Sequence, residues 1–114
     1  MRYGLITLML LIHVLAFGQK SGSISGKVLD SENNIVEFVN VFLTSVNDSS
    51  TIVNGTVTDN TGSFVLTNVP LGKYFIQFRF IGFVNLQQTV LLDDANKNIE
   101  LGTIIMEQDA IALN

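Results

Sequence analysis

Residues 55–83 read "GTVTDNTGSFVLTNVPLGKYFIQFRFIGF", and this stretch decides the fold. Apolar and polar residues alternate along it with a period of two, which is typical of β-strands that bury one face. Turn-forming residues interrupt the alternation at 58–62 and 68–73, so the stretch predicts three successive strands. It contains no His and no Cys, the side chains that serve most often as proton shuttles and metal ligands. We therefore interpret the stretch as a scaffold and not as a catalytic site.

The same alternation continues on both sides of this stretch. Further alternating runs cover residues 23–28, 38–44, 52–58, 84–92 and 98–106, which together with residues 63–67 and 73–80 make seven short strands. Gly102 is expected to form a β-bulge that brings Leu101 into phase with Ile104 and Met106. Helical periodicity is absent from residues 19–114. The pattern predicts an all-β fold, a seven-stranded antiparallel β-sandwich.

Turn and core positions follow from this pattern. Asp59 and Gly62 predict a tight hairpin turn, because Asp bonds its own backbone and Gly accepts a positive φ. Pro70 breaks the chain again, since it cannot donate a ladder hydrogen bond. Phe64, Phe78 and Phe80 are expected to dominate the core. The complete set of predicted turn and core residues is Gly55, Asp59, Gly62, Phe64, Pro70, Gly72, Tyr74, Phe78, Phe80 and Gly82.

Two features of the sequence are expected at the surface of the sandwich, Phe75 and the first strand. Phe75 falls on the opposite face from Tyr74 and Phe78, and a lone exposed aromatic is the favoured interpretation. The alternative is that something outside the domain covers it. The first strand, residues 22–28, is rich in Gly and Ser, which makes it a candidate edge strand for binding by strand addition.

The N-terminal 18 residues predict a secretory signal peptide. Arg2 supplies the positive start, and residues 4–17 form the apolar run. Residues 16–18 supply small residues at the cleavage positions. A transmembrane anchor is the less favoured alternative, because His13 interrupts a run shorter than the roughly 18 apolar residues that a span requires. The predicted organisation is a signal peptide (1–18), one β-sandwich domain (19–108) and the start of a linker or coupling segment (109–114).

Charge and composition exclude several functions. Without the signal peptide the chain has five basic and ten acidic side chains, a formal charge of −5. The basic residues are scattered, which argues against nucleic-acid binding and against a polybasic membrane patch. The sequence has no Cys, and its one His is His13, so a Ser-His-Asp triad, a Cys-His nucleophile and a His- or Cys-ligated metal site are excluded from the predicted mature chain. No catalytic residue, cofactor site or metal site is predicted.

Two turns of the sequence contain acidic residues that could form a site, and each has two interpretations. Asp93 and Asp94 are adjacent in a turn, so a solvated turn is favoured over a carboxylate pair for glycoside hydrolysis. The turn at Asp59 offers oxygen ligands but lacks the spaced acids and final Glu of a calcium loop, so an Asx-type turn is favoured there.

Three stretches together resemble the carboxypeptidase regulatory-like domain, a transthyretin-like seven-stranded sandwich. They are residues 25–43, 55–83 and 99–107. The resemblance rests on "VPLGKY" at 69–74, on "IGF" at 81–83 and on the pattern G-x-V-x-D-x-x-G-x-F at 55–64. It covers residues 22–107. The version with "NDSSTIVNGTVTD" at 47–59 resembles the copy at the N-terminus of TonB-dependent outer-membrane receptors and related β-barrel proteins of certain gram-negative bacteria.

This resemblance implies a non-catalytic accessory or interaction domain at the periplasmic face of the outer membrane, which modulates nutrient uptake. Its implied partners are the plug and barrel of the same receptor chain, which would follow residue 114, and a TonB-type coupling protein. The chain ends where the next receptor segment would begin, so a fragment of a longer receptor is favoured. The alternatives are a free-standing secreted domain that binds protein or glycan and an accessory domain of a zinc carboxypeptidase.

Overall fold

The computed structural model describes residues 20–110. The predicted signal peptide and residues 111–114 of the predicted linker lie outside the described residues. The described part is all-β, and none of its segments is a helix with the length and hydropathy needed to cross a bilayer. Its strands are β1 (Ser21–Asp30), β2 (Asn40–Ser45), β3 (Asp48–Val57), β4 (Ser63–Pro70), β5 (Gly72–Arg79), β6 (Leu86–Leu92) and β7 (Asn98–Met106).

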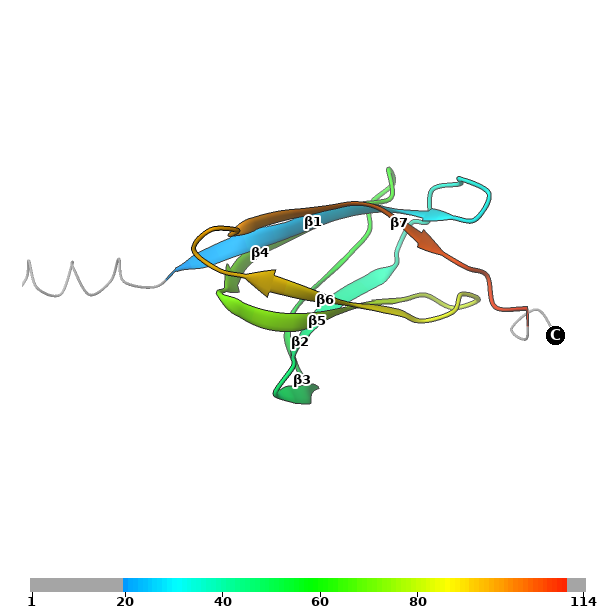
Figure 1. Ribbon diagram of the computed structural model, residues 1–114. Helices are drawn as coiled ribbons and strands as arrows, with labels where there is room; N and C mark the ends of the chain where they lie inside the picture. The colour runs from blue at the N-terminus through cyan, green and yellow to red at the C-terminus, as the bar shows by residue number, and fades with distance from the viewer. Residues whose placement is uncertain (1–19, 111–114) are drawn as a thin grey trace, which may run out of the picture.

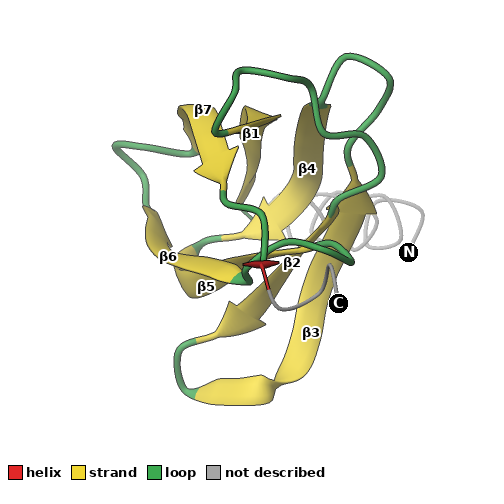
Figure 2. Ribbon diagram, turned by 90° about the vertical axis from the view of Figure 1, so that its right-hand side faces the viewer, coloured by secondary structure: helices red, strands yellow, loops and turns green. Residues whose placement is uncertain are grey.

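The strands form two stacked layers, which confirms the predicted seven-stranded sandwich (Figures 1 and 2). One sheet has the order β4-β1-β7 and the other the order β3-β2-β5-β6. Neighbouring strands are antiparallel except for β1 and β7, which run parallel. The prediction of antiparallel sheets is therefore wrong for this pair. β1 and β7 lie at opposite ends of the domain's sequence, so no short hairpin fixes their relative direction.

β1 is the central strand of its sheet, bonded to β4 on one side and to β7 on the other. The prediction that it forms an exposed edge is wrong. Its glycines mark positions of close packing: a Cβ on Gly22 would collide with the backbone carbonyl of Lys97, and a Cβ on Gly26 would lie 2.9 Å from the Phe64 ring. Glycine in a strand interior often marks such a close approach, and here it does not mean weak register.

The turn after β3 is tight, but it is not a hairpin. The N–H of Gly62 donates to the carbonyl of Asp59 at 2.9 Å, and Gly62 adopts φ 76°. The strands that flank this turn belong to different sheets, because β3 pairs with β2 whereas β4 pairs with β1. The predicted hairpin is therefore wrong. Turn chemistry is local, and it closes the turn without determining which strands pair across it.

The core fills the space between the two layers. Phe64 and Phe78 are buried and meet edge to face, with ring centroids 5.5 Å apart. Phe80 is only partly buried, because β5 ends at Arg79, and its ring packs against Phe83 at the rim of the core. The remaining buried apolar residues are Ile24, Val28, Val36, Val39, Val41, Leu43, Leu66, Val69, Tyr74, Ile76, Val90, Leu92, Ile104 and Met106.

The predicted bulge in β7 is confirmed. The pairing of β1 with β7 shifts register at this position, and Gly102 has φ 71°. Beyond it Ile104 and Met106 point into the core. β6 is shorter than predicted: it begins at Leu86, and Val84 lies in the preceding loop with about half of its surface exposed.

Candidate interaction surface

Several predicted turn and core residues form a single structural unit at the start of β5. The Tyr74 hydroxyl donates to the carbonyl of Pro70 at 2.7 Å. Gly72 lies under the Tyr74 ring, where an added Cβ would approach the phenol oxygen to 3.4 Å. Burial of the ring raises the pKa of Tyr74 above its ordinary value. The motif "VPLGKY" therefore fixes the crossing from one sheet to the other and offers no reactive group.

The carboxylate of Asp59 is occupied by its own turn. Its Oδ1 accepts the Thr61 hydroxyl at 2.7 Å, the Thr61 N–H at 2.8 Å and the Ser63 N–H at 3.1 Å. These bonds, with that of the Thr61 hydroxyl the strongest, hold the pKa of Asp59 below its ordinary value. Residues 20–110 contain no cluster of three or more His, Cys, Asp or Glu arranged to hold a metal. Asp59 is thus part of an Asx-type turn.

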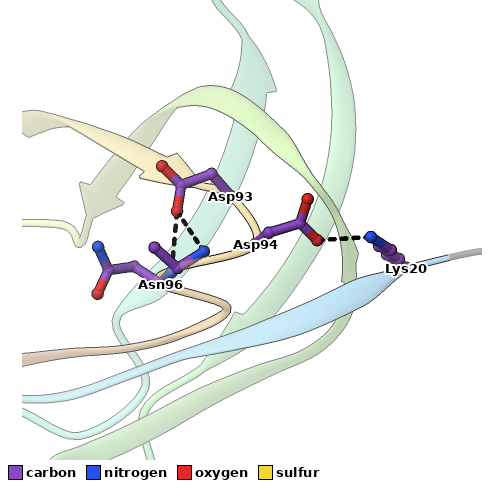
Figure 3. Close-up of polar contacts among 5 residues, drawn as sticks. Lys20, Asp93, Asp94 and Asn96 are labelled. Atoms are coloured by element: carbon purple, nitrogen blue, oxygen red, sulfur yellow. Dashed lines mark hydrogen bonds and ion pairs between the residues drawn. The ribbon is translucent and has the colours of Figure 1, made fainter.

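Asp93 and Asp94 make separate contacts in the turn between β6 and β7 (Figure 3). Asp93 Oδ1 accepts the N–H groups of Ala95 at 3.0 Å and Asn96 at 2.8 Å. Asp94 forms an exposed ion pair with Lys20 at 2.8 Å. The hydrogen bond and the charge of Lys20 lower the pKa of Asp94. The two carboxylates are engaged at different places on the turn, and they do not face a common substrate position.

The two outer faces of the sandwich differ in composition. We call the outer face of β4-β1-β7 the hydroxyl face, because hydroxyl side chains dominate it. It has no aromatic residue, and its charges have both signs, Lys27 and Glu100. By register its outward residues are Ser23, Ser25, Lys27 and Leu29 on β1, Ser63, Val65 and Thr67 on β4, and Asn98, Glu100, Thr103 and Ile105 on β7.

We call the outer face of β3-β2-β5-β6 the aromatic face, because Phe42 and Phe75 lie on it. Thr44 lies beside Phe75 on this face and is 2% exposed, so the neighbouring side chains cover it. By register the outward residues are Asn40, Phe42 and Thr44 on β2, Ile52, Gly55 and Val57 on β3, Lys73, Phe75, Gln77 and Arg79 on β5, and Gln87, Thr89 and Leu91 on β6.

A groove crosses the aromatic face over β2 and β3. It has a volume of about 660 Å³, and Gly55 leaves its floor open because this residue has no side chain. Phe42 and Arg79 form one wall, and the Arg79 guanidinium carbon lies 5.3 Å from the centroid of the Phe42 ring. Ile52 and Val57 form the other wall and are 62% and 50% exposed. The groove is thus a largely apolar channel with one cation at its side.

The groove lies next to a partly free sheet edge. β3 is the outer strand of its sheet and pairs only with β2. Near its C-terminal end, the Asn54 side chain donates to the carbonyl of Thr67 at 2.9 Å and ties β3 to β4. Residues 48–53 are all exposed and belong to the β2–β3 hairpin, which projects beyond the other strands (Figures 1 and 2). An unpaired edge of this kind can accept an added strand.

Comparison with known protein families assigns the chain to one of them. Residues 24–114 match the CarboxypepD_reg-like domain family. The chain belongs to this family. No curated protein matches the chain in sequence. A CarboxypepD_reg-like domain is a β-sandwich interaction domain, which agrees with the fold and with the apolar groove on an outer face.

Solved structures share the sandwich with this CarboxypepD_reg-like domain. The major pilin subunit of Bacillus cereus is 19% identical with a TM-score of 0.64, over 79% of this chain and 31% of that one. The group B streptococcus pilus 2b backbone protein is 16% identical with a TM-score of 0.60, over 83% and 44%. Catechol 1,2 dioxygenase of Acinetobacter radioresistens is 14% identical with a TM-score of 0.62, over 87% and 55%.

These likenesses show the fold alone. The chain covers 31%, 44% and 55% of the length of these three solved chains. Pilin subunits and an enzyme share the same sandwich, so the fold by itself does not determine activity. The function of the CarboxypepD_reg-like domain must therefore be argued from its own surface.

Sequence reasoning missed the groove. It interpreted Phe75 as a lone exposed aromatic, whereas Phe75 is half-buried and lies one row from Phe42 on the same face. The signal was present in the sequence, because Phe42 and Phe75 occupy the outward phase of strands whose inward phase is already apolar. What the sequence did not reveal was the pairing of β2 with β5, which places Arg79 and Phe42 side by side.

Proposed function

We propose that the chain is the periplasmic accessory domain at the N-terminus of a TonB-dependent outer-membrane receptor. In this role it modulates nutrient uptake and transports nothing by itself. The plug and barrel of the same receptor chain and a TonB-type coupling protein are its proposed partners. Membership of the CarboxypepD_reg-like family, the predicted signal peptide and the resemblance of residues 22–107 to the receptor copy support this proposal.

The observation that carries an interaction role is the aromatic face. A β-sandwich is stable when its two inner faces are packed together, so Phe42, Phe75 and the exposed Ile52 are not needed to close the core. Apolar residues gathered on an outer face, with polar residues around them, are typical of a surface that contacts another protein. The neighbouring free edge at residues 48–53 offers backbone hydrogen bonds to the same partner.

A non-catalytic role agrees with the chemistry of residues 20–110. The acidic side chains with lowered pKa values, Asp30, Asp48, Asp59 and Asp94, are engaged in turns or in the ion pair with Lys20. Their pKa shifts come from hydrogen bonds that stabilise the ionised form, and such shifts suit structural caps better than proton transfer near neutral pH.

The first test is an immunoblot of fractionated cells that make the native gene product, with an antibody against residues 20–108. We expect a band far larger than the domain in the outer-membrane fraction. A band of domain size in the periplasm or the medium would overturn the receptor proposal and indicate a free-standing binding domain.

The second test addresses modulation of uptake. Deletion of residues 20–108 from the receptor gene, with the signal peptide retained, should slow growth on the transported nutrient while the barrel remains in the outer membrane. Unchanged growth on every nutrient, with the barrel present at its normal level, would contradict a role in uptake.

A further inference from the structure

The aromatic face has a charge opposite to that of the domain as a whole. The chain beyond the predicted signal peptide has ten acidic and five basic side chains. The outward residues of the aromatic face nevertheless include Lys73 and Arg79 and no Asp or Glu. The hydroxyl face lacks this asymmetry, since Lys27 and Glu100 both lie on it. The aromatic face is therefore suited to an acidic partner. The net negative charge of the rest of the domain would repel an acidic partner from other parts of the surface.

Arg79 is held in place without being neutralised. Its guanidinium lies over the Phe42 ring at 5.3 Å, and its Nη2 donates to Gln77 Oε1 at 3.0 Å. Within residues 20–110 the ion pair of the structure joins Lys20 and Asp94, and no carboxylate pairs with Arg79. The guanidinium has five N–H donors in a fixed plane, so most of them remain for a ligand. A planar cation that is already positioned loses little entropy when a carboxylate binds.

The groove beside Arg79 determines what the carboxylate should be attached to. Its walls at Ile52 and Val57 are apolar, and its floor at Gly55 is backbone, so an apolar side chain can lie in it. Ile52 of the groove belongs to the exposed segment 48–53 of the outer strand β3, so a chain that pairs with this edge would lie beside the groove. A peptide strand has side chains that alternate between faces, and every second one would lie over the groove.

We propose that this groove binds an extended peptide segment that carries a carboxylate side chain. The carboxylate accepts hydrogen bonds from Arg79, and a neighbouring apolar side chain lies over Gly55 between Ile52 and Val57. This inference deepens the proposed function and rests on it only in treating the domain as an interaction module. It adds the chemistry of the partner, which is an acidic strand and not a basic one, a glycan or a second copy of this acidic domain.

The test uses the full chain, labelled with ¹⁵N, and two blocked octapeptides of alternating Thr and Val. One peptide has a single central Glu, and the other has Gln at that position. We expect the Glu peptide to shift the amide resonances of residues 40–42, 52–57 and 79. We expect the Gln peptide to bind about tenfold more weakly, which corresponds to one hydrogen-bonded charge pair.

Matched variants locate the site. Arg79→Gln should reduce binding of the Glu peptide to the level of the Gln peptide, whereas Lys27→Gln, the equivalent change on the hydroxyl face, should leave binding unchanged. Arg79→Lys keeps the charge but not the planar fork, so intermediate affinity is expected. Thermal unfolding of each variant checks that the fold is retained. We expect unchanged unfolding temperatures, because the side chains of Lys27 and Arg79 are exposed.

Four results would overturn the inference. The first two are the absence of amide shifts with either peptide at millimolar concentration and equal affinity for the two peptides. The third is a set of shifts confined to the hydroxyl face. The fourth is a set of shifts at the groove that appear without peptide as the chain is concentrated, which would mean that a second copy covers the groove. The result is separable from the proposed function. Binding of the Glu peptide by a chain found at domain size in the medium would keep the inference and overturn the receptor proposal.

Discussion

The hydroxyl face and the aromatic face are built from strands of the same sandwich, and yet they have different compositions. Ser, Thr and balanced charges predominate on the hydroxyl face, which also has the aliphatic residues Leu29, Val65 and Ile105. The aromatic face has Phe42, Phe75 and Arg79. Both faces lie one strand thickness from the same core, so the demands of folding are similar on the two sides. The difference therefore indicates a demand that folding does not impose, and contact with a partner explains it most directly.

The glycines of the two sheets also differ in their surroundings. In the three-stranded sheet, Gly22 and Gly26 allow close approach of Lys97 and the Phe64 ring. In the four-stranded sheet, a Cβ on Gly55 would meet only ordinary contacts, at 3.5 Å from Phe42. Glycine is thus required by packing in β1, but in β3 it serves to keep the groove open.

The largest predicted effect concerns the core that both faces share. Phe78→Ala or Phe64→Ala should lower the free energy of unfolding by about 3 to 5 kcal/mol, because each removes a buried aromatic ring of the Phe64–Phe78 pair. Chemical denaturation of the variants and the unchanged chain measures this loss. A denaturation midpoint that barely moves would show that the inner faces are assigned wrongly.

The next effect separates the two kinds of glycine. Gly22→Ala should destabilise by about 1 to 3 kcal/mol, because its Cβ collides with backbone that cannot move freely. Gly55→Ala is the matched control, and we expect it to change stability by less than about 1 kcal/mol. Thermal unfolding of both variants measures the difference. Equal losses in the two would contradict the assignment of β1 to the centre of its sheet.

A smaller effect is expected on the aromatic face itself. Phe42→Ala should cost about 1 kcal/mol, because its ring is only half-buried and a full burial contributes about 1.5 to 3 kcal/mol. Binding of the Glu peptide should nevertheless fall strongly, since the ring positions Arg79. Denaturation and peptide titration of the same sample compare the two losses. A variant that unfolds like Phe78→Ala would make Phe42 a core residue and remove the contrast between the faces.

The smallest effect concerns acid stability. Hydrogen bonds, led by that from the N–H of Asn34 to Asp30 and that from the Thr61 hydroxyl to Asp59, lower the pKa values of both carboxylates in the folded chain. Groups with a lowered folded pKa stabilise the fold above their unfolded pKa, near 3.8, and lose this contribution as the pH falls through the folded value. Stability measured from pH 6 to pH 2 should therefore fall below pH 4. Asp59→Ala should flatten that fall, and identical profiles for Asp59→Ala and the unchanged chain would contradict the Asp59 turn.

The sequence predicted the local features of the fold better than the pairing of its strands. The alternation identified Phe64 and Phe78 as core residues, and the glycine at position 102 indicated the bulge, because both signals are local. The hairpin at Asp59 and the edge position of β1 were wrong, since sheet membership depends on contacts between distant residues. The groove depends on such contacts as well: Arg79 meets Phe42 only because β5 pairs with β2.

The most direct test of the central claim is a paired cross-linking measurement in cells that make the native gene product. A photo-reactive amino acid is placed at Asn40 on the aromatic face or at Thr103 on the hydroxyl face, both of which are exposed. We predict a cross-linked product from position 40 and none from position 103. Cross-linking from position 103 alone, or equally from both positions, would contradict the claim that the aromatic face is the interaction surface.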